Sequence, residues 1–233
     1  MAATALWLQD TICIAVLIAC HWIAPVLSQR TRRDQQALAS LGAGISLAYV
    51  FLHLIPQLTG PLQTNLLLVA LLGITIPYTL NSIHAQRINF NNLAGHGRLI
   101  NFAFVNYIYA YSMPSILYSR PEGSVLYVLA IGGHILMADR TMASEHPLIF
   151  RNRLRWIGSA ALMAGSVHSA ILERLIGHPI NDISINYASA FVTGGIIMTV
   201  FHEELPEPSA SRSKWFILGL TVMTGLLLGL TLQ

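Results

Sequence analysis

The chain has 233 residues, of which 54% are hydrophobic and only 10% are charged. Soluble domains use about 25% charged residues, so this composition excludes an ordinary soluble protein and indicates an integral membrane protein. Its 13 basic residues outnumber its 10 acidic residues, but they lie in short clusters between apolar segments. That pattern is typical of orientation in a bilayer and argues against nucleic-acid binding.

Apolar segments of about 20 residues, the length that crosses a bilayer as a helix, follow one another along the chain. Each is expected to be helical, because an open strand cannot satisfy its backbone hydrogen bonds in lipid. The predicted spans are 5–27, 37–57, 64–81, 99–118, 124–143, 154–176, 184–203 and 214–232. The predicted fold class is therefore an all-α membrane protein with eight transmembrane helices.

The basic residues of the connecting loops predict the orientation. Eleven of them fall on one side of the membrane, and only Arg120 and Arg174 fall on the other. Basic loops remain in the cytoplasm, so both termini are expected outside, in a plasma or inner membrane. The first ten residues contain no Lys or Arg, unlike a cleaved signal peptide, so the first span is expected to be retained. The predicted cytoplasmic loops are 28–36, 82–98, 144–153 and 204–213.

Residues 42–57 recur as residues 192–207, at an offset of 150 positions. An odd number of spans separates the two copies, so they are expected to cross the bilayer in opposite directions. This is the pattern of transporters that consist of inverted repeats. The matched pairs are Gly44 and Gly194, Val50 and Val200, Phe51 and Phe201, and Pro56 and Pro206.

The repeat predicts a 3+2+3 arrangement of helices within one transmembrane domain, 1–233. Residues 1–81 form the first repeat, 99–143 the central helix pair and 154–233 the second repeat. Residues 82–98 form a polar cytoplasmic linker that contains His84 and His96. The linker is either a solvated loop or a weak metal-capture loop, since imidazole is a common metal ligand.

The two copies, SLGAGISLAYVFLHLIP and SAFVTGGIIMTVFHEELPE, resemble the second and seventh spans of the Zrt/Irt-like (ZIP) family of divalent metal transporters. The order of spans, the outside termini and the His-bearing loop after the third span also resemble that family, along nearly the whole chain. The resemblance implies uptake of zinc, iron or manganese toward the cytoplasm. It implies a metal site at the middle of the membrane, and pairing of two copies as one option for the assembly.

The family places its metal between the fourth and fifth spans. The aligned segments are Val105-Asn106-Tyr107-Ile108-Tyr109-Ala110 and His134-Ile135-Leu136-Met137-Ala138-Asp139. The resemblance implies that His134, Asn106 and Asp139 contact the metal ion. His134 is also a candidate because ionisable residues inside a membrane are usually functional.

The chain departs from the family where most of the ligands are expected. Val105 replaces a histidine, and Tyr109 and Ile135 replace acidic residues. No acidic residue lies within a predicted span between positions 99 and 138, although anionic oxygens are the ligands that best offset a divalent charge. Whether transport is retained therefore stays open.

Three further residues complete the candidate metal contacts. His53 near the end of the second span and Glu203 near the end of the seventh are related by the repeat, so symmetry suggests an outer and an inner gate. His168 lies in the outer half of the sixth span.

Two alternatives to transport remain. The first is a ZIP-like protein without transport activity, which serves as a membrane scaffold or as an accessory subunit of a larger complex. The second, a minor one, is a haem protein with His53 and His168 as axial ligands. An enzyme is not expected, because no HExxH or comparable motif occurs.

Overall fold

The computed structural model describes residues 2–29, 32–59, 63–85, 91–119, 123–145, 153–176, 182–204 and 212–231. All regular secondary structure in this part of the chain is helical, which confirms the all-α prediction. The α-helices are α1 (Ala2–Ser28), α2 (Arg32–Tyr49), α3 (Ile55–Gln57), α4 (Gln63–Ala85), α5 (Asn91–Ser119), α6 (Gly123–Glu145), α8 (Arg155–Ile176), α9 (Asp182–Thr199) and α10 (Ser213–Thr231). Two π-helical turns, η1 (Val50–Leu54) and η3 (Val200–Glu204), follow α2 and α9.

Each predicted span coincides with a helix, and the second span consists of α2, η1 and α3 in series. The largest difference concerns the predicted linker 82–98. Helix α4 continues to Ala85 and α5 begins at Asn91, and residues 82–98 contain no proline that would break a helix there. Most of the expected loop is thus helical, and the side chains of His84 and His96 lie outside the described residues.

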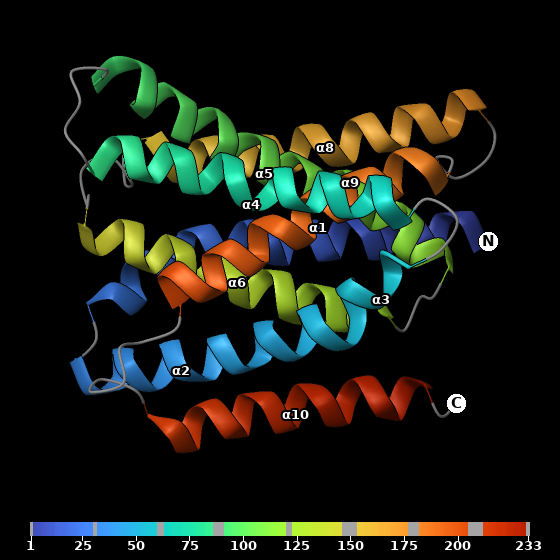
Figure 1. Ribbon diagram of the computed structural model, residues 1–233. Coiled ribbons are helices and arrows are strands. Elements are labelled where there is room, and N and C mark those ends of the chain that lie inside the picture. Colours follow the sequence, from blue (N-terminus) through green and yellow to red (C-terminus); the bar gives the residue numbers. More distant parts are fainter. Residues whose placement is uncertain are drawn as a thin grey trace.

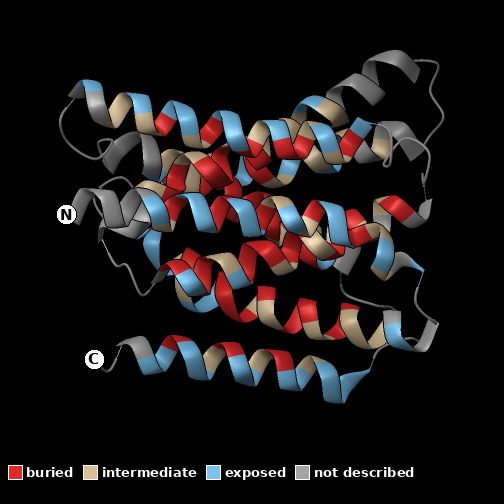
Figure 2. Ribbon diagram, turned by 180° about the vertical axis from the view of Figure 1, so that it is seen from behind, coloured by how far each residue is buried: buried red, intermediate tan, exposed pale blue. Residues whose placement is uncertain are grey.

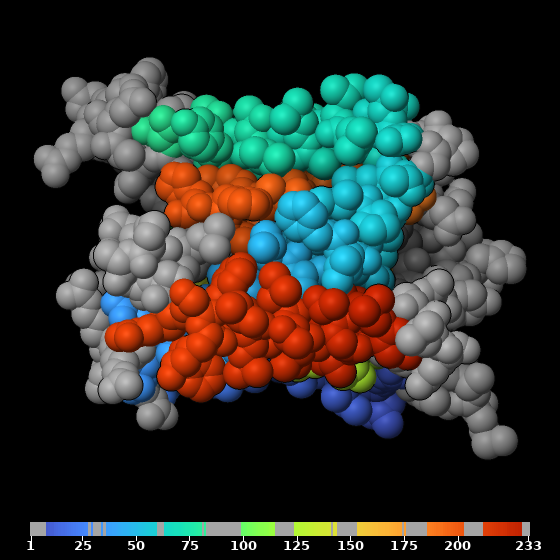
Figure 3. Space-filling model, turned by 60° about the horizontal axis from the view of Figure 1, so that its bottom comes forward, coloured from blue at the N-terminus to red at the C-terminus, as the bar shows by residue number. Residues whose placement is uncertain are grey.

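Successive long helices run in alternating directions, so the start of α1 and the end of α10 lie at the same end of the bundle (Figure 1). Helices α2 and α9 run in opposite directions. The most extensive contacts join α2 to α10, α4 to α9, α5 to α8 and α1 to α6. On the face seen in Figure 3, α10 and α4 lie on either side of the segment that contains η1 and α3 and of the end of α9.

The exterior of the bundle is apolar. Large hydrophobic side chains face outward on most of the long helices, and Leu175 is 78% exposed and Ile100 68% exposed. In contrast, Asp10, His21 and Asp139 are at most 5% exposed. Figure 2 shows buried residues on the inward faces of the helices and exposed residues on their outward faces. An apolar exterior of this extent is typical of a surface that contacts lipid.

Three helices in the described residues are long and apolar enough to cross a membrane: Leu8–Leu27, Gln36–Gln57 and Gln63–Leu80. Ser213–Gly229 is a shorter apolar helix. The central helices α5 and α6 are less apolar because they carry buried polar residues, which include Asn106, His134 and Asp139.

The π turn η1 has a local cause in the sequence. The amide of Ile55 donates to the carbonyl of Val50, five residues earlier. Pro56 follows two residues after the turn ends; its ring lacks an amide hydrogen and clashes with the carbonyl four residues earlier in an α-helix. A wider turn relieves this clash. Pro206 stands in the same relation to η3.

Glycines allow the two outer helix pairs to pack backbone against backbone. A methyl group on Gly44 of α2 would meet the carbonyl oxygen of Phe216 on α10, and one on Gly194 of α9 would meet the carbonyl oxygen of Ala70 on α4. The partner helices also place glycines at these contacts. Gly219 of α10 faces the carbonyl of Leu41 on α2, and Gly73 of α4 faces the carbonyl of Phe191 on α9. Small residues at such positions permit close helix packing in lipid.

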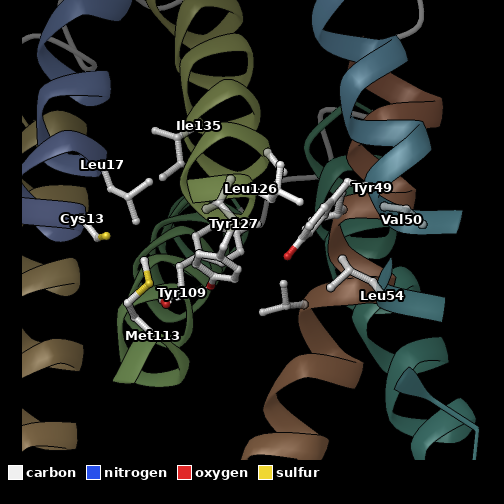
Figure 4. Close-up of a cluster of buried hydrophobic side chains, with 14 of the residues drawn as sticks. Cys13, Leu17, Tyr49, Val50, Leu54, Tyr109, Met113, Leu126, Tyr127 and Ile135 are labelled. Carbon is white, nitrogen blue, oxygen red and sulfur yellow. Dashed lines mark hydrogen bonds between the residues drawn. The ribbon is translucent and has the colours of Figure 1, made fainter. Parts of the chain in front are cut away.

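The main hydrophobic core joins α1 and α2 to the central helices. Leu17 of α1, Tyr49 of α2, Tyr109 of α5 and Ile135 of α6 are all at most 3% exposed, and Figure 4 shows them pointing into the same cluster. The hydroxyl of Tyr127 donates to the carbonyl of Tyr109 at 2.9 Å. This bond satisfies a buried hydroxyl and links α6 to α5.

Replacing Gly194 with Ala tests the backbone contact between α9 and α4. The new methyl group would collide with the carbonyl of Ala70, so we expect a loss of about 1–3 kcal/mol in unfolding free energy, measured by denaturant titration in mixed micelles. Gly225→Ala is the matched control because nothing lies within 4 Å of its added carbon. Equal stability of the two variants would contradict the close packing of α4 and α9.

Candidate functional site

A cavity of about 100 Å³ lies between α4, α5, α6 and α9. It is lined by all six positions of the fourth and fifth spans that align with ligands of the ZIP family or with their replacements. Three of them keep the type of ligand that the resemblance implies, and the other three replace it. These residues are Asn106, His134, Asp139, Val105, Tyr109 and Ile135.

The cavity extends from His134 toward one end of the bundle. Its other lining residues include Leu80 near the end of α4, Asn101 near the start of α5 and Met142 near the end of α6. Met198 and Thr199, at the end of α9, complete this side. The cavity therefore lies in the half of the bundle opposite to the end where α1 begins.

His134 is 6% exposed and lies near the aromatic ring of Tyr109. The two ring centroids are 6.3 Å apart and the rings are nearly perpendicular, at 83°. Tyr109 thus occupies space beside the histidine where the resemblance implies an acidic ligand.

Asp139 forms an ion pair with His21 of α1, through Nδ1 of the imidazole and Oδ2 of the carboxylate. Both side chains are buried, at 0% exposure for His21 and 1% for Asp139. A methyl group on Gly158 of α8 would lie 2.6 Å from Cε1 and Nε2 of His21. Only a glycine leaves room for the ring at this crossing.

Asn106 determines where the hydrogens of His21 lie. Its Nδ2 donates to the carbonyl of Phe102 at 2.9 Å, so its Oδ1 faces Nε2 of His21 at 3.1 Å. A carbonyl oxygen only accepts hydrogen bonds, so Nε2 carries a hydrogen. Nδ1 of the same ring faces Oδ2 of Asp139.

This arrangement limits the chemistry of the cavity. Both ring nitrogens of His21 are engaged, by Asp139 and Asn106, so neither is free to bind a metal ion. In the described part of the chain, no group of three or more His, Cys, Asp or Glu side chains is placed to hold a metal ion. A cation in the cavity would have His134 and Asn106 as neutral donors and Asp139 as its one carboxylate.

The other three predicted contacts do not join this site. His53 lies in η1, where its Nε2 accepts a 2.9 Å hydrogen bond from Nε2 of Gln57 and its ring lies beside that of Tyr49. His168 is exposed on α8 and hydrogen-bonds with Tyr107. The structure does not bring His53 and His168 to shared partners, which gives no support to a haem site between them. Glu203 lies in η3, and its side chain is outside the described residues.

His21 is the residue that analysis of the sequence missed. It lies on the same face of α1 as Leu17 and Ala24, at helical spacings of four and three residues, and all three are 0% exposed. A polar residue within the buried face of a membrane helix is a functional candidate by itself, and this signal could have identified it. No protein-family model and no curated protein matches the chain.

A double-mutant cycle tests the His21–Asp139 pair. His21→Gln and Asp139→Asn should each cost about 3 kcal/mol of unfolding free energy, because each leaves a buried partner uncompensated. The double variant should cost about 2 kcal/mol less than the sum of the two. The unfolding free energies of the two single variants and the double variant are measured by denaturant titration in mixed micelles.

His202→Gln is the control, since His202 is exposed, and it should change stability by less than about 0.5 kcal/mol. Additive single costs would show that the two side chains do not interact.

Proposed function

We propose that this chain is a divergent ZIP-like carrier that moves divalent metal cations toward the cytoplasm. The observation that carries the proposal is the cavity. Six positions from two helices, chosen only by their alignment with a metal motif, line one space of about 100 Å³. An unrelated helical bundle would not be expected to gather these positions.

We also propose the 3+2+3 inverted repeat with eight crossings. Three features support it: η1 and η3 are 150 residues apart, Gly44 and Gly194 make corresponding contacts, and α2 and α9 run in opposite directions. In inverted-repeat transporters the substrate binds where discontinuous helices of the repeats meet near the midplane. The cavity lies beside the end of α9, next to the π turn η3.

In this proposal His134 and Asn106 are neutral ligands and Asp139 is the charged one. A divalent cation needs anionic oxygen to offset the loss of its water. Because Asp139 already binds His21, an entering ion competes with the imidazole for the carboxylate. Release toward the cytoplasm then restores the His21–Asp139 pair, so the carrier never leaves a bare carboxylate in the membrane.

A ZIP-like scaffold or accessory subunit without transport is the second candidate, and a different observation favours it. The carboxylate of Asp139 already has a partner within the protein, the imidazole of His21. Val105, Tyr109 and Ile135 place bulky groups where ligands are expected. In this case the pair and the packing stabilise the fold, and the cavity conducts nothing.

Zinc uptake into proteoliposomes separates the two candidates. For a carrier, His134→Ala should lower the initial rate at least about tenfold, because it removes a ligand. Gly133→Ala is the matched control: it is the neighbouring residue, and nothing lies within 4 Å of its added carbon. If zinc uptake by wild-type proteoliposomes only equals that of protein-free vesicles, the result would favour the scaffold.

Cysteine labelling tests the proposed orientation. In a variant without Cys13 and Cys20, a cysteine at Gln29, after α1, should be protected from a membrane-impermeant maleimide added outside. A cysteine at Thr59, after α3, should react. Both positions are exposed, so access depends on the side of the membrane. Reaction of both in sealed cells would contradict the first two crossings.

A further inference from the structure

A second buried carboxylate, Asp10, lies at the other end of the bundle from the cavity. It is 5% exposed and stands in the third turn of α1, where this helix packs against α6 and α8. Ser166 of α8 donates to its Oδ2 at 2.9 Å. Beside it, Gln9 donates to Ser124 of α6 at 2.9 Å.

The carboxylate of Asp10 is incompletely satisfied. Its Oδ1 is buried and has no hydrogen-bond partner. In the part of the chain that the structure describes, no cationic side chain forms an ion pair with it. Asp139 has His21 in the equivalent role. A buried, unpaired carboxylate is costly, so a cation from solution would stabilise it.

The surrounding donors are oxygens. Asp10 supplies a carboxylate, and Ser166 supplies a hydroxyl that contacts it. Glu173 lies seven residues after Ser166, about two turns along the same face of α8. The hydroxyl of Ser124 on α6 bonds with Gln9, the residue next to Asp10. Hard cations such as Mg²⁺, Ca²⁺ and Mn²⁺ prefer such ligands. Glu173 is only partly buried, whereas Asp10 is 5% exposed.

This place is distinct from the cavity. Asp10 and His21 are eleven residues apart, which is about 16 Å along a helix and close to three full turns, so they share one face of α1. None of the residues around Asp10 lines the cavity.

We propose that Asp10 is the central ligand of a hard-cation site at the end of the bundle where α1 begins, with Glu173 as the acidic residue on its outer side. Ser166 orients Asp10 so that Oδ1 is directed to the ion. The site does not depend on transport through the cavity.

Mn²⁺ binding to the purified full-length chain in detergent, followed by the loss of the free-ion signal in electron paramagnetic resonance, tests the site. Asp10→Asn keeps the shape of the side chain and removes its charge, so it should weaken Mn²⁺ binding at least about tenfold. Ser166→Ala should weaken it severalfold, since the carboxylate loses its orienting bond. Gly225→Ala is the control and should leave this binding unchanged, because nothing lies within 4 Å of its added carbon.

Two results would overturn the proposal: no Mn²⁺ bound by the wild type at millimolar concentration, or affinity that Asp10→Asn leaves intact. If Asp10→Asn does not give monodisperse protein, Ser166→Ala decides, because it removes one hydroxyl and no charge. Loss of Mn²⁺ binding in His134→Ala with no effect of Ser166→Ala would assign the ion to the cavity and not to Asp10.

Discussion

The buried pair of His21 and Asp139 constrains the rest of the structure. Two ionisable side chains in an apolar bundle are tolerated only when each compensates the other and their remaining hydrogen-bonding groups are satisfied. Asn106 meets that need on one side, and the small volume of Gly158 admits the ring. As a result α1 is tied to both central helices, and α8 must approach closely where the imidazole lies.

The same constraint shapes the cavity. The carboxylate that would attract a cation is neutralised within the protein, and Tyr109 lies beside His134. A site of this kind binds a divalent ion less strongly than a cluster of free carboxylates would. Weak binding is compatible with a carrier, because a carrier must release its ion. It is equally compatible with a scaffold protein that transports no ion.

The sequence predicted the helices well and the site in part. Apolar length alone located the helices, because lipid demands long apolar segments. Alignment placed His134, Asn106 and Asp139, and the structure brings them to one cavity. The role of His21 could not be deduced in the same way, because its partner lies 118 residues away. Pairing across that distance depends on how α1 is rotated against α6, which hydropathy does not record.

His53 and His168 also show that the sequence does not predict which way a side chain points. Their depth in the predicted spans suggested a shared site, but depth does not fix the direction in which a side chain points. In the structure each has local aromatic neighbours, Tyr49 for His53 and Tyr107 for His168.

The π turns have a mechanical consequence. A π turn contains one residue more than an α turn, so shifting this extra residue by one position rotates a side chain by about 100° around the helix axis. In α2 and α9 the glycine contacts lie before the turn. The segments that follow η1 and η3 are therefore rotated about the helix axis relative to the glycine-packed parts of α2 and α9.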